Sequence, residues 1–427
     1  MFNLINQQNY EFWYEFISYE ELYKAYIDCK KRKRTTHNCE SFEINETKNL
    51  WKLYKELNTF TYKIGRSTVF IFHEPGSNKF REIFAADFID RIIQHLLVNR
   101  INNIFEFLWS SKSFSCRKEK GTSYGVKCLF EDIKEVSNEY SENCFIITFD
   151  IYSFFDSLNK DIMFREISKY IKDNFNLLNI YNKENVNKKD LIFTIWLFKL
   201  ILYNDPRKNC IFKQPKSFWN NIPKHKSAFH AIRNHYLAVG NITSQLFANI
   251  YLYILDIKLN ILYKEGRYVD DIYVIIKDIK DFIKVKNIIE EELYYRDLKL
   301  QNKKTHIQPY QNGIQFIGKI IKKDRIYILN KTKGKFIKRI KFFYDEFYKN
   351  KYITIKDLEY IVNCINSYLG MCKHYTTYKL RKSIMNTEYI KCLGKYCYIN
   401  KNINKLSIYQ DYLQIHKRKH KYYNQIN

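Results

Sequence analysis

The sequence predicts an α+β fold in which helices cover one face of a sheet, and three observations support this prediction. Strand-like apolar runs and amphipathic stretches follow one another in the order strand, helix, helix, strand, strand, with acidic residues at the strand ends. Apolar residues make up 46% of the 427 residues, enough for a substantial core. Only 11 Gly and 5 Pro interrupt the chain, so we expect long regular elements and few flexible linkers.

The first half of the chain predicts helices first and then two strands. Residues 1–63 are expected to be mostly helical, because apolar residues recur there at spacings of three and four. A strand is expected in STVFIFHEP, ending at Pro75, followed by an amphipathic helix over 87–105 with Asp87 available as its N-cap. CFIITFDIYSFFDS (144–157) predicts a strand that ends at Asp150, then a turn and the helical KDIMFREISKYIKDNF.

The second half predicts an insertion, a helix, a strand and a basic helical end. Residues 172–235 are Asn- and Lys-rich and have the character of an insertion. A single helix is expected over 240–259 and a buried strand over 266–278, because β-branched and aromatic residues fill the latter. Two short strands are expected around IQFIGKII, and the pattern from 333 onward is helical and basic.

Charge is the strongest bulk indication of a partner. Lys and Arg total 72 against 45 acidic residues, a net charge of +27, together with 37 Tyr and 32 Phe. A basic, aromatic-rich chain suits a polyanion whose bases can stack, so nucleic acid is the expected partner. An AT-rich genome would also enrich Lys, Asn, Ile, Tyr and Phe, but it does not explain why basic residues outnumber acidic ones so heavily.

Other bulk features argue against a membrane span and a zinc site. The longest apolar runs are short and interrupted by charges, and the N-terminus lacks the pattern of a secretory signal. The ten cysteines include no C-x-x-C pair with zinc spacing, and without a signal peptide reduced thiols in a cytoplasm are expected.

Three acids are candidates for a metal site. Asp270 and Asp271 stand side by side in GRYVDDIYVIIKD, where their mutual repulsion is costly unless a cation compensates it. Asp150 ends another apolar strand about 120 residues upstream, so the three carboxylates would converge if the strands are neighbours. Oxygen ligands suit two Mg²⁺ ions roughly 3.5–4 Å apart, as phosphoryl transfer requires. Alternatively, each acid caps a turn or pairs with Arg267 or Lys277.

These segments resemble the reverse transcriptases, and within them the bacterial retroelement branch, over roughly residues 15–385. FDIYSFF is similar to the first palm motif and GRYVDDI to the third. The resemblance implies an RNA-directed DNA polymerase, a nucleotidyltransferase with the fold of a right hand, with two Mg²⁺ ions for which Mn²⁺ can substitute. It also implies that Asp150, Asp270 and Asp271 are catalytic and that these three and Ile151 hold the metal.

The resemblance assigns further roles around the incoming nucleotide. Phe155 corresponds to the aromatic residue under the sugar, where a large ring would clash with a 2′-hydroxyl; alternatively it is an ordinary core aromatic. AVGNITSQ resembles the second palm motif, with Gly240 close to the nucleotide and with Ser244 and Gln245 facing the template strand. Val239 stands where retroviral and group II intron enzymes have glutamine, so we hypothesise relaxed fidelity.

The fourth motif, the primer grip, the fingers and the thumb are matched as well. Lys304, in LKLQNKKTHI, is the candidate proton donor to pyrophosphate, or else a solvated lysine. The remaining candidates are basic residues for phosphate contacts and a glycine at the primer grip. In the fingers, Arg81 and Arg91 are expected to bind the nucleotide, with pairing to Asp87, Asp90 or Glu119 as the alternative. The candidates for nucleic-acid binding are Arg117, Lys120, Gly318, Lys373, His374, Lys379 and Arg381.

The resemblance also implies a domain order. The expected parts are a helical N-terminal extension (1–63), fingers (64–143), a palm (144–325) carrying the insertion at about 172–235, a helical thumb (326–395) and a basic tail (396–427).

Two biological roles follow from the GNITSQ form of the second palm motif. It resembles both defence-associated enzymes, which copy a dedicated non-coding RNA, and diversity-generating retroelement enzymes, which work with an accessory protein. We favour antiphage defence, with RNA template, cDNA product and dNTPs as partners and an accessory protein or homo-oligomer as a further expectation. A non-catalytic, maturase-like RNA-binding protein is the alternative from another class.

Overall fold

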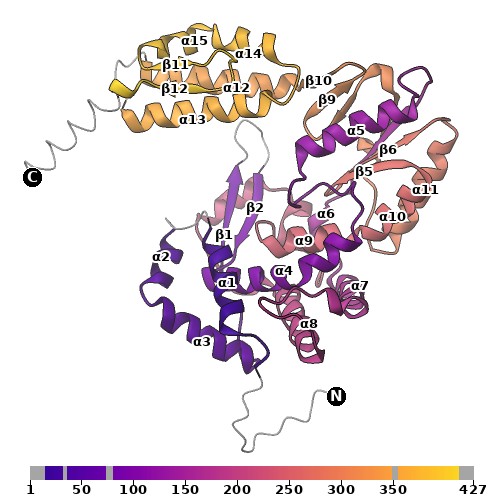
Figure 1. Ribbon diagram of the computed structural model, residues 1–427, viewed down its shortest axis with the longest axis vertical. Helices are drawn as coiled ribbons and strands as arrows, with labels where there is room; N and C mark the ends of the chain where they lie inside the picture. The colour runs from indigo at the N-terminus through magenta and orange to yellow at the C-terminus, as the bar shows by residue number, and fades with distance from the viewer. Residues whose placement is uncertain (1–14, 32–35, 74–79, 349–353, 413–427) are drawn as a thin grey trace, which may run out of the picture. The chain divides into compact units, whose positions relative to one another are not determined.

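The computed structural model describes residues 15–31, 36–73, 80–348 and 354–412. The chain divides into two compact units: Met1–Cys116, Phe149–Leu262 and Ile283–Thr305 form the first unit, and Arg117–Thr148, Tyr263–Phe282 and His306–Asn427 form the second. Both contain helices and sheets (Figure 1), which confirms the predicted α+β class. Among the described residues, no helix is both long and apolar enough to cross a membrane.

The first unit is mainly helical and carries one three-stranded sheet. Its strand order is β2-β1-β4, with β1 and β2 antiparallel and β4 parallel to β1. The strands are β1 (Ser67–His73), β2 (Phe80–Ala85) and β4 (Cys210–Phe212). The helices are α1 (Tyr19–Lys30), α2 (His37–Glu43), α3 (Glu46–Asn58), α4 (Phe88–Leu108), α6 (Phe154–Ser157), α7 (Lys160–Asp173), α8 (Lys188–Tyr203), α9 (Ile242–Tyr251) and α10 (Tyr253–Leu262), with α11 (Asp281–Tyr294) starting at the boundary of the two units.

Helix α4 forms the centre of the first unit, and its start confirms the predicted N-cap. The Asp87 carboxylate accepts a hydrogen bond from Ile89 N at 3.2 Å. Arg100 is fully buried and donates to both carboxylate oxygens of Glu21, at 2.6 and 2.7 Å, which ties α4 to α1. Loss of either partner of such a buried pair would destabilise the fold strongly, because the remaining charge would stay buried without compensation.

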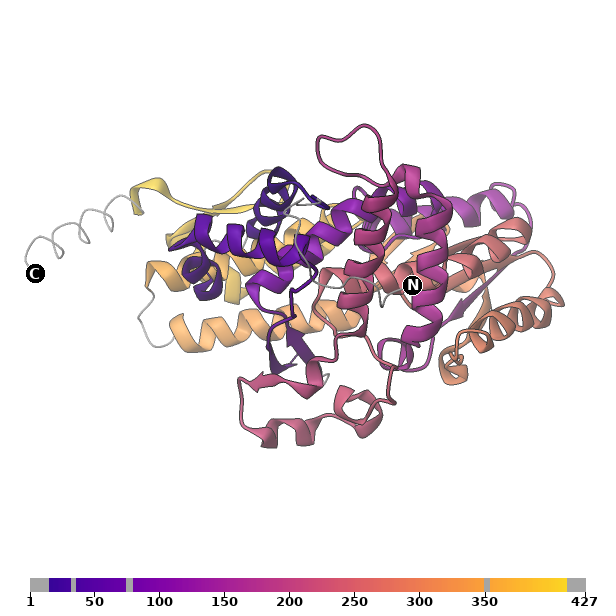
Figure 2. The same ribbon diagram turned by 90° about the horizontal axis from the view of Figure 1, so that it is seen from below.

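The segment predicted as an insertion contributes to the first unit. Helix α8 packs on α4 and α7, and its N-terminus has a capping box in which Asn187 and Asp190 bond each other's backbone. The chain then runs through β4, which pairs with β1, and through several 3₁₀ turns as far as His230. Figure 2 shows these turns as the pink loop at the bottom of the view.

The second unit contains a four-stranded sheet of order β5-β6-β3-β7. Its strands are β3 (Phe145–Phe149, the last residue of which is counted in the first unit), β5 (Lys264–Tyr268), β6 (Asp271–Ile276) and β7 (His306–Pro309). Helix α5 (Thr122–Val136) packs on β5 and β6 (Figure 1). Tyr273 of β6 donates from its hydroxyl to the Asp132 carboxylate at 2.6 Å, which fixes α5 against this sheet.

The rest of the second unit is a meander followed by a helical subdomain. The meander has the order β10-β9-β8. The helical subdomain has its own core, in which Phe336 and Tyr368 stack with ring centroids 3.9 Å apart. The elements are β8 (Ile314–Phe316), β9 (Lys319–Lys322), β10 (Arg325–Ile328), α12 (Asn330–Phe343), α13 (Ile355–Cys372), α14 (Tyr378–Met385), α15 (Glu388–Lys391), β11 (Cys397–Ile399) and β12 (Leu406–Ile408).

Three local expectations differ from the structure. The single helix expected over 240–259 breaks at Leu252, which separates α9 from α10. The single strand expected over 266–278 is a hairpin of β5 and β6. The residues after 396 begin with the β11–β12 hairpin, whose Cys397 and Leu406 are buried in the helical subdomain, and residues 413–427 of the expected tail lie outside the described residues.

Candidate active site

Asp150 is held at the end of β3 by the segment that follows α11. Its main-chain oxygen accepts from Gln301 N at 2.8 Å, and Tyr152 N donates to Lys299 O at 2.9 Å. The same segment turns at Gln301, where Lys304 N donates back to the Gln301 carbonyl. This turn brings the Lys304 ammonium to 2.6 Å from Asp150 Oδ2. The sequence proposed both residues for the site, and the structure pairs them.

Within the first unit, Lys304 is the cation that compensates the negative charge of Asp150. The Lys304 side chain is 59% exposed, whereas that of Asp150 is 15% exposed. An exposed ammonium gains little from such a pair, because water screens it. Lys304 is therefore free to exchange Asp150 for another partner. Ile151, the next residue, is buried, and only its main-chain carbonyl offers a ligand atom.

Asp270 and Asp271 lie at a tight hairpin turn in the second unit. Tyr268 and Asp271 face each other across the hairpin, so Val269 and Asp270 form the loop. Val269 adopts a φ of +59°, a conformation that β-branched residues rarely adopt. The buried Arg267 supports this turn by donating from Nη1 to Val269 O at 3.0 Å. Backbone strain of this kind is retained where a fixed geometry is needed.

The chemistry of these donors fits a hard divalent cation. Asp150, Asp270, Asp271 and the Ile151 carbonyl offer only oxygen, the ligand type that Mg²⁺ and Mn²⁺ prefer. Asp150 belongs to the first unit and the aspartate pair to the second. Within the part of the chain that the structure describes, no three His, Cys, Asp or Glu side chains are grouped closely enough to hold a metal ion.

The residues expected around the nucleotide are joined by backbone contacts in the first unit. Leu237 N donates to Phe155 O at 2.9 Å, which links α6 to the segment leading into Gly240. Gly240 has a φ of +111°, and a Cβ there would lie 3.1 Å from Ile83 Cγ2 of β2. Only glycine combines that backbone with such a close approach. Phe155, Gly240 and β2 therefore share one neighbourhood.

The arginines expected in the fingers do not form the ion pairs considered as their alternative. Arg81 lies exposed on β2, and Arg91 donates from Nε to Ala86 O at 2.8 Å. Asp90 instead accepts from the Tyr62 hydroxyl at 2.6 Å and from Gly65 N. Asp87 is occupied as the N-cap of α4.

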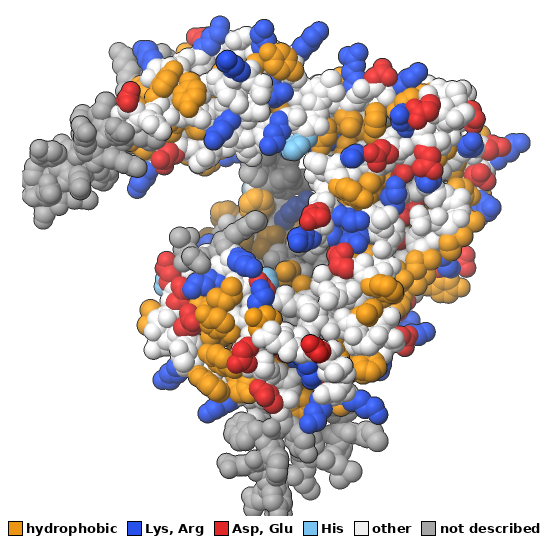
Figure 3. All heavy atoms as spheres, viewed as in Figure 1, with side chains coloured by type: hydrophobic (Ala, Val, Ile, Leu, Met, Phe, Trp, Pro, Cys, Tyr) orange, Lys and Arg blue, Asp and Glu red, His pale blue; other side chains and the backbone are white. Residues whose placement is uncertain are grey.

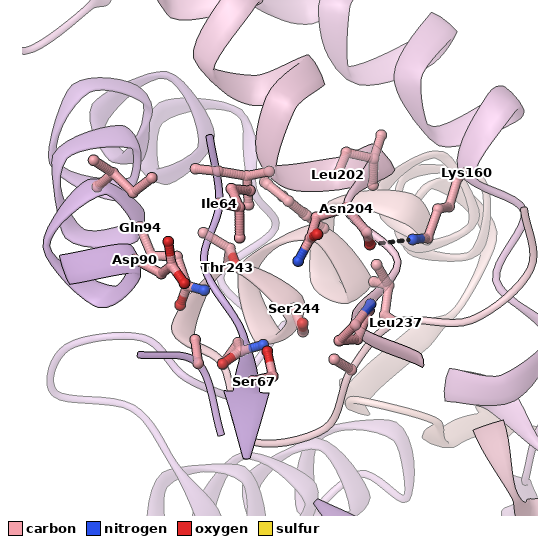
Figure 4. Close-up of a pocket in the computed structure, with 17 residues that line it drawn as sticks. Ile64, Ser67, Asp90, Gln94, Lys160, Leu202, Asn204, Leu237, Thr243 and Ser244 are labelled. Carbon is pink, nitrogen blue, oxygen red and sulfur yellow. Dashed lines mark hydrogen bonds between the residues drawn. The ribbon is translucent and has the colours of Figure 1, made fainter. Parts of the chain in front are cut away.

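Ser244 and Gln245 have different surroundings. Gln245 is exposed, whereas Ser244 is buried and lines a small polar cavity together with Asp90, Gln94 and Thr243 (Figure 4). That cavity measures about 30 Å³, an order of magnitude below the size of ordinary ligand pockets. It is too small for a nucleotide, so Gln245 is the member of the pair that remains available to a template.

The candidates for phosphate contacts in the second unit are mostly exposed. Lys373, His374 and Lys379 are exposed around the start of α14, in the part of the chain where Figure 3 shows Lys and Arg side chains spread over α12–α15. Arg381 is different: it is buried and donates from Nη1 to the carbonyls of Asn402 and Ile403, at 2.7 and 2.6 Å. It holds the loop before β12, and we leave it out of the proposed interface.

The other second-unit candidates lie in a loop and in the meander. Lys120 lies over the Tyr124 ring, with its ammonium 5.0 Å from the ring centroid, and Arg117 is half-buried in the same loop. Gly318 has a φ of +74° between β8 and β9, and a Cβ added there would meet no atom within 4 Å. The turn is thus exposed, with free space around Gly318.

The sequence did not predict the pair of interacting carboxylates formed by Glu82 and Asp156, the latter next to Phe155 in the chain. Glu82 is buried and accepts from Trp219 Nε1 at 2.6 Å, Ser227 Oγ at 3.0 Å and Ala228 N at 2.7 Å. Burial, followed by the charge of Glu82, raises the pKa of Asp156 to about 7. The residues that bond Glu82 lie about 140 positions away in the chain, so a local sequence pattern could not predict these contacts.

The stability of the protein should depend on pH through Asp156. Because its folded-state pKa lies above the ordinary value, this carboxyl favours the folded state fully below about pH 4 and loses that contribution as pH rises through 7. We expect Asp156→Asn to raise the free energy of unfolding by roughly 2–4 kcal/mol at pH 8 and to leave it unchanged at pH 4. Urea denaturation at both pH values measures this, with Asp173→Asn on an exposed acid as control. Equal effects at the two pH values would contradict the assignment.

Comparison with known proteins places these motifs in a family. Residues 72–321, more than half of the chain, match the profile of the family described as reverse transcriptase (RNA-dependent DNA polymerase). No curated protein matches. Among solved structures, apo telomerase from Candida tropicalis truncated from its C-terminal domain is 15% identical, with a TM-score of 0.44 over 62% of this chain and 55% of that one. Telomerase from Candida albicans in complex with a fragment of telomeric RNA is 12% identical, with a TM-score of 0.44 over 77% of this chain and 55% of that one. The chain thus spans a little over half the length of these telomerases.

Proposed function

Because this chain belongs to the reverse transcriptase family, we propose that it is an RNA-directed DNA polymerase that makes cDNA from a dedicated RNA template. The observation that carries this proposal is the order of the sheet. Strand β6, which Asp271 opens, is the neighbour of β3, which Asp150 directly follows. Asp150 thus follows one strand of this sheet, Asp271 opens another and Asp270 precedes it in the hairpin loop, which supports the proposal.

The proposed metal site consists of Asp150, Asp270 and Asp271 with the Ile151 carbonyl. Divalent ions bound there would stabilise the attacking and leaving oxygens of the transferred phosphoryl group. The strained turn at Val269 fixes where Asp270 is presented, so less reorganisation is needed when the substrate arrives. Gly240, which the family resemblance places close to the nucleotide, packs against Ile83 just before the start of α9, and a backbone bond links Phe155 to the segment that leads into it.

We propose that Lys304 donates a proton to the leaving pyrophosphate. The Lys304 ammonium lies 2.6 Å from Asp150 Oδ2, and because the side chain is exposed it can move to another oxygen. We expect Lys304→Met to slow nucleotide addition by roughly 10²-fold, the usual value of a positioned general acid. The same variant should need less Mg²⁺ for half-maximal rate, because the cation competing for Asp150 is gone.

Two further variants separate these roles of Lys304. Lys303→Met removes a neighbouring exposed charge and should leave both quantities unchanged. Lys304→Arg keeps a cation near Asp150 but cannot give up its proton to pyrophosphate, since arginine stays protonated. Single-turnover rates of Lys304→Arg equal to those of the wild type would contradict the proton-donor role.

For the biological role we propose antiphage defence. The enzyme would copy one structured non-coding RNA, and its net charge of +27 favours holding such an RNA. Phage plating with the wild type and with Asp270→Asn tests the role, with sequencing of RNA that co-purifies with the protein. Protection that survives the loss of Asp270 would refute a defence role based on cDNA. A co-purified template repeat with a small accessory protein would instead favour the diversity-generating alternative.

A further inference from the structure

A surface pocket of about 510 Å³ lies in the first unit, where the segment after α8 passes the N-terminus of α7. This volume falls within the range of pockets that bind small ligands. Lys160, the first residue of α7, forms one wall. The other walls come from 203–208 and from 233–234, parts of the chain that the function above does not use.

The pocket carries an excess of positive charge. Four cationic residues line it against the single carboxylate of Asp205. That carboxylate is already engaged by Arg207, which donates from Nε to Oδ1 at 2.7 Å and from Nη2 to Oδ2 at 2.8 Å. Lys160, Lys208 and Arg233 form no ion pair with this lining acid.

Among the residues that line the pocket, Lys160 gives the strongest indication of an anionic ligand. It is only 7% exposed, and its ammonium donates to Asn204 O at 3.0 Å, as the dashed line in Figure 4 marks. Among the described residues it has no other acceptor, although an ammonium has three protons to donate. Burial lowers its pKa to about 8, with Arg207 acting in the same direction and Asp205 opposing it. A buried cation of this kind would be relieved by an anion in the pocket.

The lining is also held in place before any ligand binds. Lys160 N donates to Asn234 O at 2.8 Å, which joins the two walls. Asp161 accepts from the Tyr203 hydroxyl at 2.7 Å and from Asn234 Nδ2 at 3.1 Å. These contacts use both oxygens of the nearest further acid, so they reduce its repulsion toward an anion.

We propose that this pocket binds a phosphate group, supplied by the backbone of RNA or by a free phosphate compound. Lys160 and Arg207 are the less exposed cations of its lining, and Lys208 and Arg233 are the exposed ones. Cationic side chains at several angles suit the tetrahedral oxygens of phosphate. The RNA source rests on the proposed function, because only a chain that handles RNA would present it here.

The test uses the double variant Lys208→Glu/Arg233→Glu, which alters only exposed side chains. Lys169→Glu/Lys172→Glu on the exposed side of α7 is the matched control, with the same change of net charge. Fluorescence anisotropy with a labelled 20-nucleotide RNA is measured over a range of salt concentrations. We expect the pocket variant to bind at least about 10-fold more weakly and to show a shallower salt slope by about one to two phosphates. The control should stay within about 2-fold of the wild type.

Calorimetry with inorganic phosphate and with dATP distinguishes the two sources. Weaker RNA binding with no heat from either compound assigns the pocket to the RNA backbone. Saturable binding of phosphate or dATP by the wild type and the control, lost in the pocket variant, assigns it to a free phosphate compound. Equal behaviour of the pocket variant and the control in both assays overturns the proposal.

Primer extension on a short homopolymer template keeps this test separate from the proposed function. The pocket variant should extend a saturating primer–template at the wild-type rate, because none of its changes lies in the catalytic motifs. If the wild type shows no extension but the pocket variant still loses phosphate binding, the polymerase assignment fails while the pocket stands.

Discussion

Asp270→Asn is expected to lower the rate of DNA synthesis by at least about 10³-fold, the value of several kcal/mol of charge stabilisation by a bound metal. The side chain keeps its size, so the hairpin of β5 and β6 and the turn at Val269 should be unchanged. What disappears is one negative charge of the proposed site for a divalent cation. Single-turnover primer extension with saturating Mg²⁺ and dNTPs measures the loss.

The control for Asp270 is an acid in the same unit. Asp278 is exposed beyond the end of β6 and accepts from Lys280 N at 2.9 Å. Asp278→Asn makes the same chemical change outside the motif and should leave the rate within about 2-fold of the wild type. If Asp270→Asn stays within 10-fold of the wild type while binding the same primer–template, the metal site is assigned wrongly.

Phe155→Ala is expected to let the enzyme accept ribonucleotides. An overpacking clash of about 2–3 kcal/mol between the ring and a 2′-hydroxyl corresponds to a roughly 10²-fold preference for dNTPs, which the variant should lose. The backbone bond from Leu237 N to Phe155 O does not involve the ring, so the link between α6 and the segment leading to Gly240 should persist. Rates with matched dNTP and rNTP on one template give the selectivity directly.

Phe154 provides the control that distinguishes a ring that excludes ribonucleotides from one that only packs in the core. The two rings are edge-to-face with centroids 5.5 Å apart, but Phe154 is buried whereas Phe155 is partly exposed. Phe154→Leu should lower stability by removing core volume and should leave sugar selectivity unchanged. A loss of stability without a change of selectivity in Phe155→Ala would show that its ring only packs.

Local signals in the sequence predicted the elements that depend on local physics. The N-cap Asp87 and the strand that ends before Asp150 each follow from residue type and spacing within a few positions. The hairpin at Val269 could not be found this way. Its turn lacks the glycine or asparagine that such turns usually require, and it depends on Arg267 instead.

Long-range contacts set the parts that the sequence did not reveal. The break at Leu252 carries neither glycine nor proline to mark it. Parallel pairing of β4 with β1 joins residues about 140 positions apart, and the cations around Lys160 are scattered over more than 70 positions. Asp150 and Lys304 were both predicted, but their pairing depends on the backbone bond from Gln301 N to Asp150 O, 151 positions away in the chain.

The most direct test of the account is primer extension by the purified chain on a heteropolymeric RNA template with Mg²⁺ and dNTPs. We expect DNA products that reach the end of the template, require the divalent ion and disappear in Asp150→Asn and Asp270→Asn. A chain that binds the RNA primer–template but adds no nucleotide with either Mg²⁺ or Mn²⁺ would contradict it and would favour a non-catalytic RNA-binding protein.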